Sequence, residues 1–161
     1  CVFGVTAEGD TEELAASLVA DLGGSLIWVP EERRALYHAG LAHGANHLVT
    51  LVAQAMDLLR ESGADDPAAT LRPLLNAALD NALSYGDAAL TGPIVRGDVN
   101  TVRAHLADIA ESSPSSLESY VSMARATAER AVLDGRLLPI RAAKLDRILD
   151  EALAEHRRAR A

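Results

Sequence analysis

EERRALYHAGLAHGANHLVTLVAQAMDLLRES, residues 31–62, is the longest helical pattern in the chain. Its apolar residues recur at helical spacing but cover more than one stripe, so the stretch predicts a helix that is apolar nearly all round. Such a helix is buried on several sides, either in a core or in a subunit interface. Because soluble monomers avoid an extended apolar patch, we expect a homodimer.

Further helices are predicted after this stretch, so residues 31–161 have a mainly α pattern. Asp66-Pro67 is an N-cap followed by a first-turn proline. Pro73, in the same helical pattern, predicts either a kink or the true start of that helix. The remaining helices are expected to begin at Asp98, Ser113-Pro114 and Pro139.

The residues before the long helix have a different pattern. Residues 1–5 and 25–29 are short apolar runs typical of strands, and residues 11–22 have helical spacing. A strand, a helix and a strand form a βαβ-like unit, which buries too little apolar surface to fold alone. We therefore interpret residues 1–30 as the end of an α/β domain. Because residue 1 is Cys1 and not Met, we expect the chain to be a fragment or a processed product.

Composition and charge limit the possible partners and surroundings. The net charge of −8 disfavours a nucleic-acid surface, so no nucleic-acid partner is expected. Cys1 is the single cysteine, which excludes an internal disulfide framework and favours the reducing cytoplasm. No apolar run is long enough to span a membrane, and no signal peptide is recognisable.

The stretch LTGPIVRGD, residues 90–98, interrupts the helical sequence with glycine, proline and polar side chains. Glycine and proline fix a turn here, so Thr91 and Arg96 lie at a helix junction where they can be aimed at a ligand. The alternative is an ordinary connection between helices. Under both interpretations Asp98 is the N-cap of the next helix.

Several polar residues interrupt the long helix. At 100° per residue, His38 and Asn46 are about 80° apart, which places them broadly on one side. A histidine can act as a general acid and an asparagine can orient a carbonyl. The alternative is that these residues lie at the surface or bond to a backbone carbonyl.

His43 and His47 have the i, i+4 spacing of two metal ligands. The glutamate of a His-Glu-x-x-His motif is missing, however, so no metal site is expected. The chain also has no glycine-rich phosphate-binding motif, so a dinucleotide, if one is bound, would be held by residues upstream of Cys1.

Two motifs carry a resemblance to a known family: YHAG through ANHLV, residues 37–49, and ALTGPIVRGD, residues 89–98. They resemble a bacterial family of oxidoreductases that join a Rossmann-like NADP-binding domain to a helical domain of unknown function. That helical domain is similar to the C-terminal domain of 6-phosphogluconate dehydrogenase. The resemblance implies that residues 1–30 are a remnant of the Rossmann-like domain, and residues 31–161 the helical dimerisation and substrate domain.

The resemblance also implies an activity, because some relatives serve as ketopantoate reductases in pantothenate synthesis. The expected reaction is reduction of a small 2-keto acid by NADPH, with NADP held by the missing N-terminal domain. Asn46 matches an asparagine of the wider group, but its usual lysine partner is replaced by Ala42. We therefore expect His38 or His43 to donate the proton. Arg96 is expected to bind a substrate carboxylate.

These expectations give catalytic roles to His38 and Asn46, and substrate-binding roles to His43, Thr91 and Arg96. This chain alone is expected to be inactive, because hydride chemistry needs the cofactor. Two alternatives remain: a non-catalytic helical module that only mediates association, and a related reductase that acts on an imine or another small carbonyl.

Overall fold

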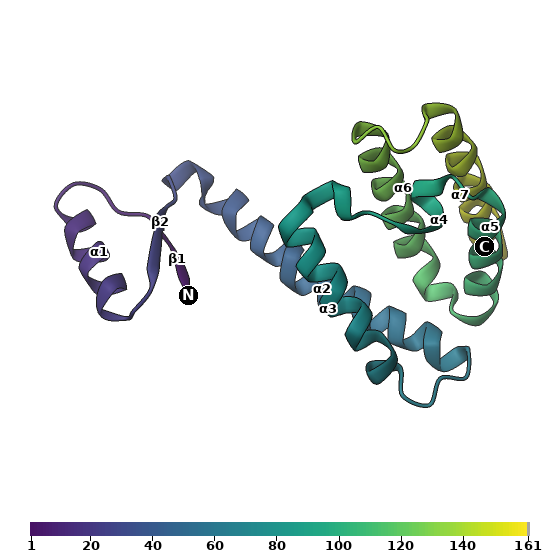
Figure 1. The fold of residues 1–161 in the computed structure, drawn as a ribbon, viewed down its shortest axis with the longest axis horizontal. Helices are drawn as coiled ribbons and strands as arrows, with labels where there is room; N and C mark the ends of the chain where they lie inside the picture. Colours follow the sequence, from purple (N-terminus) through teal and green to yellow (C-terminus); the bar gives the residue numbers. More distant parts are fainter. Residues whose placement is uncertain (161) are drawn as a thin grey trace. The chain divides into compact units, whose positions relative to one another are not determined.

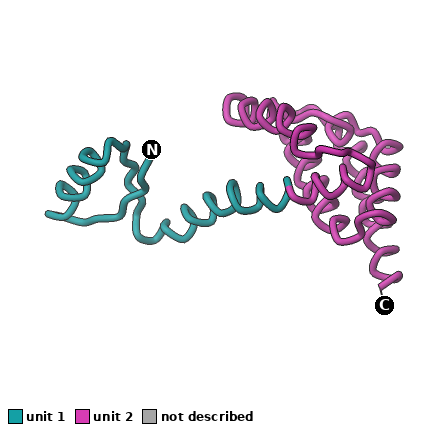
Figure 2. The backbone as a smooth tube through the Cα atoms, turned by 90° about the horizontal axis from the view of Figure 1, so that it is seen from below, with its two compact units in different colours: residues 1–52 teal, residues 53–161 magenta. Residues whose placement is uncertain are grey.

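The computed structural model describes residues 1–160 and is mainly helical, as predicted (Figure 1). The chain forms two compact units, residues 1–52 and residues 53–161 (Figure 2). None of the described helices is long and apolar enough to cross a membrane.

The first unit begins with the predicted βαβ element. Strand β1 (Val2–Val5) is followed by helix α1 (Thr11–Asp21) and strand β2 (Ser25–Trp28). The two strands are parallel, with Val2 opposite Ser25 and Val5 opposite Trp28. The parallel pairing confirms the βαβ interpretation, because a helix must cross over to join parallel neighbours.

Helix α2 (Arg34–Glu61) follows a short 3₁₀ turn (Glu31–Arg33) and begins in the first unit. No residue of α2 is fully buried. Leu36 is 66% exposed and Val49 is 70% exposed. A position inside the core of this chain was one of the two expectations for this helix, and that expectation is wrong.

The last part of α2 lies in the second unit. There the Ser119 hydroxyl donates a 2.7 Å hydrogen bond to Gln54 Oε1, which satisfies one of the polar side chains of the long helix. Helix α3 (Pro67–Tyr85) begins at Pro67, where the Asp66 side chain accepts a 2.9 Å hydrogen bond from the Ala69 amide. Pro73 therefore lies within the helix and does not start it.

The remaining helices pack together around the core of the second unit. They are α4 (Gly92–Arg96), α5 (Val99–Ser112), α6 (Leu117–Leu133) and α7 (Pro139–Arg160), with short 3₁₀ turns at Gly86–Ala89 and Pro114–Ser116. Contacts join α4 to α5 and α6, and α7 to both α5 and α6. The core consists of apolar side chains from these four helices together with Leu137, and its largest fully buried members are Val102, Leu117, Val121, Leu145 and Leu149.

Candidate functional site

The segment expected to be a loop contains a one-turn helix, α4. Thr91 is its N-cap residue, with extended backbone, and Gly97 ends it in the left-handed conformation at φ 65°. Ile94 and Val95 are buried in the core of the second unit. Glycine and proline therefore act here as predicted, but the two buried residues make the segment part of the core and not a free connection.

Two arginines, Arg130 on α6 and Arg136 in the connection from α6 to α7, hold the backbone that leads into α4. Arg136 donates a 2.8 Å hydrogen bond from Nη1 to the Leu90 carbonyl and a further hydrogen bond from Nη2 to the Asp87 carbonyl. Arg130 Nε donates to the Asp87 carboxylate at 2.6 Å. These contacts fix the backbone before Thr91 through charge-assisted hydrogen bonds.

The backbone at the end of α4 also accepts a hydrogen bond from an arginine. Arg141 Nη1 donates a 3.2 Å hydrogen bond to the Arg96 carbonyl. A Cβ at Gly97 would lie 3.0 Å from Arg141 Cδ and 3.2 Å from Leu137 Cδ1, so a side chain here would crowd both residues and would also need the left-handed backbone that glycine adopts freely. Nothing in the local sequence around α4 indicates these arginines, because they follow α4 by more than thirty residues.

Asp98 caps α5, as the sequence predicted. Its Oδ1 accepts a 3.1 Å hydrogen bond from the Thr101 amide, and its Oδ2 accepts a 2.7 Å hydrogen bond from the Thr101 hydroxyl. These hydrogen bonds from Thr101, together with the nearby Arg96 charge, hold the pKa of Asp98 below its ordinary value. Asp98 is therefore engaged as a cap and is not free to act on a ligand.

Thr91 and Arg96 remain available on this fixed segment. Both side chains are exposed. Within residues 1–160 the Arg96 guanidinium forms no ion pair. An exposed, unpaired guanidinium on a held backbone can bind a planar carboxylate through two parallel hydrogen bonds.

The other predicted site residues lie in the first unit, on α2. The side chains of His38, His43 and Asn46 are exposed in this chain. His43 Nδ1 lies 2.8 Å from His47 Nδ1, so these two rings are hydrogen-bonded partners. Thr91 and Arg96 belong to the second unit. A cleft that they share with the site residues of α2 therefore stays a prediction.

In the part of the chain that the structure describes, no three side chains of His, Cys, Asp or Glu are grouped as a ligand set.

A pocket of about 310 Å³ lies at the carboxyl ends of β1 and β2. Ligands of α/β domains commonly bind at this edge of a sheet. Four glutamates line the pocket, Glu8, Glu12, Glu31 and Glu32. Their charge opposes a phosphate, and Glu12 lies in the first turn of α1, where a phosphate-binding helix would keep its amides free. The described residues therefore do not fit the phosphates of NADP.

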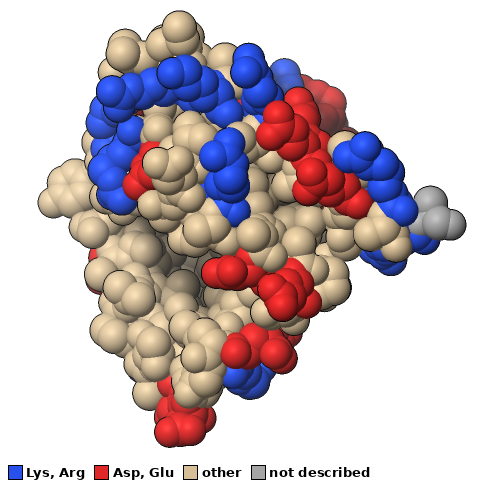
Figure 3. Space-filling model, turned by 90° about the vertical axis from the view of Figure 1, so that its right-hand side faces the viewer, with Lys and Arg blue, Asp and Glu red and all other residues tan. Residues whose placement is uncertain are grey.

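The surface charge is mixed on the face shown in Figure 3. There many Lys and Arg side chains lie toward the top of the view, and Asp and Glu side chains lie among them and below them. This distribution differs from the continuous basic surface typical of nucleic-acid binding.

Comparison with known proteins gives one family and one solved structure. The model of the family described as domain of unknown function DUF2520 matches residues 1–127. Protein TM1727 from Thermotoga maritima has a similar structure, with a TM-score of 0.73 and 20% sequence identity. That match covers 83% of this chain and 54% of the other, so this chain spans about half the length of the solved chain, and the likeness shows the fold. No curated protein matches the chain. Because the family model covers most of its length, the chain belongs to the DUF2520 family.

Proposed function

We propose that this chain is the substrate-binding and dimerising part of an NADP-dependent oxidoreductase. The enzyme reduces a small 2-keto acid, and ketopantoate is the first candidate substrate. The observation that carries the proposal is Arg96, an exposed guanidinium without an ion pair in residues 1–160, on a backbone that other arginines hold in place.

The held backbone supports this role because a fixed donor loses little conformational freedom when it binds. Arg96 would bind the carboxylate of the substrate through its planar fork. Thr91 begins the same one-turn helix, and its hydroxyl would donate a further hydrogen bond to the substrate. Both groups recognise the carboxylate end of a 2-keto acid.

The residues of α2 would act on the carbonyl end. His38 would donate a proton to the carbonyl oxygen, and the Asn46 amide would orient that oxygen. His43 would assist in binding the substrate. The proposal assigns no contact of NADP to the described residues, because four glutamates line the pocket at the strand ends.

A screen of the full-length protein with NADPH against small 2-keto acids, ketopantoate first, tests this activity. We expect Arg96→Ala to raise KM by roughly 10- to 100-fold, because it removes a charge-assisted pair of hydrogen bonds. Arg72→Ala is the matched control, since Arg72 is also exposed and lies on α3. Unchanged kcat and KM in Arg96→Ala would exclude the carboxylate-binding role, and turnover only of imines or other carbonyls would assign the related reductase.

A second candidate function, a non-catalytic module for association, is favoured by the exposed leucines of α2 and α3. Leu41 and Leu48 on α2 are 54% and 40% exposed, and Leu74 and Leu83 on α3 are 65% and 80% exposed. Such side chains are normally covered by a partner. Binding of NADPH by the full-length protein separates the two functions, because a pure association module would show no shift of melting temperature with the cofactor.

Both candidates include a homodimer, which sedimentation or light scattering tests directly. We expect a mass twice the 17.0 kDa of one chain, and we expect Leu48→Glu to yield the monomer. Thr50→Glu is the matched control, because Thr50 lies about 160° from Leu48 around the helix. A monomeric wild-type chain would contradict the proposed dimer.

A further inference from the structure

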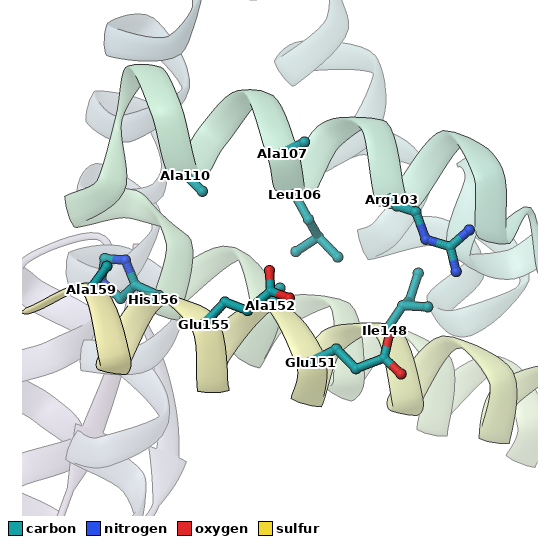
Figure 4. A pocket seen from close by; sticks show the side chains of 10 residues that line it. All are labelled: Arg103, Leu106, Ala107, Ala110, Ile148, Glu151, Ala152, Glu155, His156 and Ala159. Atoms are coloured by element: carbon teal, nitrogen blue, oxygen red, sulfur yellow. The ribbon is translucent and has the colours of Figure 1, made fainter.

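A hollow of about 380 Å³ lies between α5 and α7, away from the segment that carries Arg96 (Figure 4). The buried side chains of Leu106 and Ile148 form its apolar base. Small side chains along both helices leave the space open, at Ala107, Ala110, Ala152 and Ala159. Its volume lies within the range of small-molecule sites, about 300–1,000 Å³.

Charged side chains of both signs border this hollow. Arg103 comes from α5, whereas Glu151 and Glu155 come from α7, one helical turn apart. Arg103 lies at one end of the hollow, and the Glu155 carboxylate points toward α5 (Figure 4). Within residues 1–160 none of the three forms an ion pair. The positive charge of Arg103 and the negative charges of Glu151 and Glu155 are therefore available to a ligand.

His156 closes the end opposite Arg103 (Figure 4). It is only 8% exposed, and its one hydrogen-bond contact is a long one, 3.5 Å from Arg160 Nη1 to His156 Nε2. Its Nδ1 has no partner among the described residues. No buried side-chain nitrogen or oxygen of the described residues lacks a partner, so His156 Nδ1 keeps contact with solvent at this end of the hollow, where a ligand can reach it.

We propose that this hollow binds a zwitterionic α-amino acid with an aliphatic side chain. The Arg103 guanidinium binds the carboxylate, and the carboxylates of Glu151 and Glu155 bind the ammonium group. The aliphatic side chain lies on Leu106 and Ile148 and displaces water from them. A simple acid or a simple amine satisfies only one of the two charges.

This site is independent of the proposed reductase function. Most of its residues belong to α7, which lies beyond residues 1–127, the part that the family model matches. Membership of the family, which the match shows over residues 1–127, therefore does not by itself imply this site.

Titration of the labelled chain with L-leucine, followed by amide NMR shifts, tests the proposal. We expect saturable shifts in residues 103–110 and 148–159. The half-ligands 4-methylpentanoate and 3-methylbutylamine should bind roughly tenfold more weakly, because each loses one charge-assisted contact. Absence of saturable shifts up to about 10 mM, a millimolar limit at which even weak specific sites are occupied, would overturn the proposal.

Two variants test whether these charged side chains bind the carboxylate and the ammonium group of the ligand. Arg103→Gln should weaken the binding of L-leucine by roughly tenfold, and so should the double variant Glu151→Gln/Glu155→Gln, because each removes the partner of one charged group of the ligand. Glu118→Gln is the matched control, because Glu118 is exposed on α6 and does not line the hollow. Melting curves establish that each variant is folded. Unaltered binding in the folded variants, or shifts that depend on protein concentration and not on L-leucine, would overturn the site.

Discussion

Two regions of the molecule use the same residue type in opposite ways. In the helices α4 to α7 several large leucines are completely enclosed, and Leu117, Leu145 and Leu149 are 0% exposed. In α3 the corresponding leucines face outward, and Leu83 is 80% exposed. The first region is a finished core, whereas the apolar surface of α3 is unfinished within this chain.

The difference shows that apolar spacing alone does not identify what covers a helix. Helix α5 and helix α2 both have helical apolar stripes, but only α5 buries them against its own chain. Burial contributes about 25 cal/mol per Å² wherever it occurs, in a core or in an interface. Substitutions in the two regions should therefore differ in their effects on the isolated chain.

The largest expected effect comes from the finished core. Leu145→Ala should lower the free energy of unfolding by about 2–5 kcal/mol, because it leaves a cavity among buried side chains. Leu83→Ala should change it by less than about 0.5 kcal/mol in the monomer. Denaturant unfolding at a protein concentration low enough to give monomers measures both. Equal losses would show that α3 is as enclosed as the core.

A smaller effect is expected where the core meets the end of α4. Gly97→Ala should cost about 1–2 kcal/mol for the left-handed backbone, with a further loss from the contacts of the new Cβ with Arg141 and Leu137. Gly135 is the control, since it has φ 74° and open space around it. Thermal unfolding should show a larger loss for Gly97→Ala than for Gly135→Ala. Equal losses would show that the contacts at Gly97 do not matter.

The arginine contacts at α4 should have a more local effect. Arg136→Ala removes the donors to the Leu90 and Asp87 carbonyls, and we expect a loss of about 1 kcal/mol. Amide exchange near α4 should become faster, while exchange in the centre of α6 stays slow. Arg72→Ala serves as the exposed control. Unchanged exchange near α4 in Arg136→Ala would show that the segment is held by its buried residues alone.

The smallest effect concerns the cap of α5. Since folding lowers the pKa of Asp98, its charge stabilises the fold above pH 3.8, the ordinary value, and this contribution is lost as the pH falls through the lowered pKa. Asp98→Asn keeps a capping side chain but removes the charge. Its melting temperature should therefore lie below that of the wild type at neutral pH and approach it in acid. A difference that persists unchanged in acid would contradict the role of the charge.

The local sequence predicted the elements well where the signals were short-range. Asp66 and Asp98 cap their helices because their side chains reach amides only three residues ahead. The short helix α4 was missed, because a single turn between glycines gives no periodic pattern. Its arginine contacts were missed as well, since Arg136 lies 46 residues from Leu90 and no local pattern relates the two.

The sequence by itself determined the order of the strands and of the longer helices, the turn at residues 90–98, and the caps at Asp66 and Asp98. These depend on backbone preferences and on hydrogen bonds between near neighbours. Only the tertiary structure decided which apolar stripes are enclosed and which arginines are engaged. Arg130 and Arg136 pair with backbone and carboxylate groups of the segment before α4, whereas Arg96 forms no ion pair in residues 1–160. Such contacts join residues far apart in the chain, so they are fixed by packing and not by spacing.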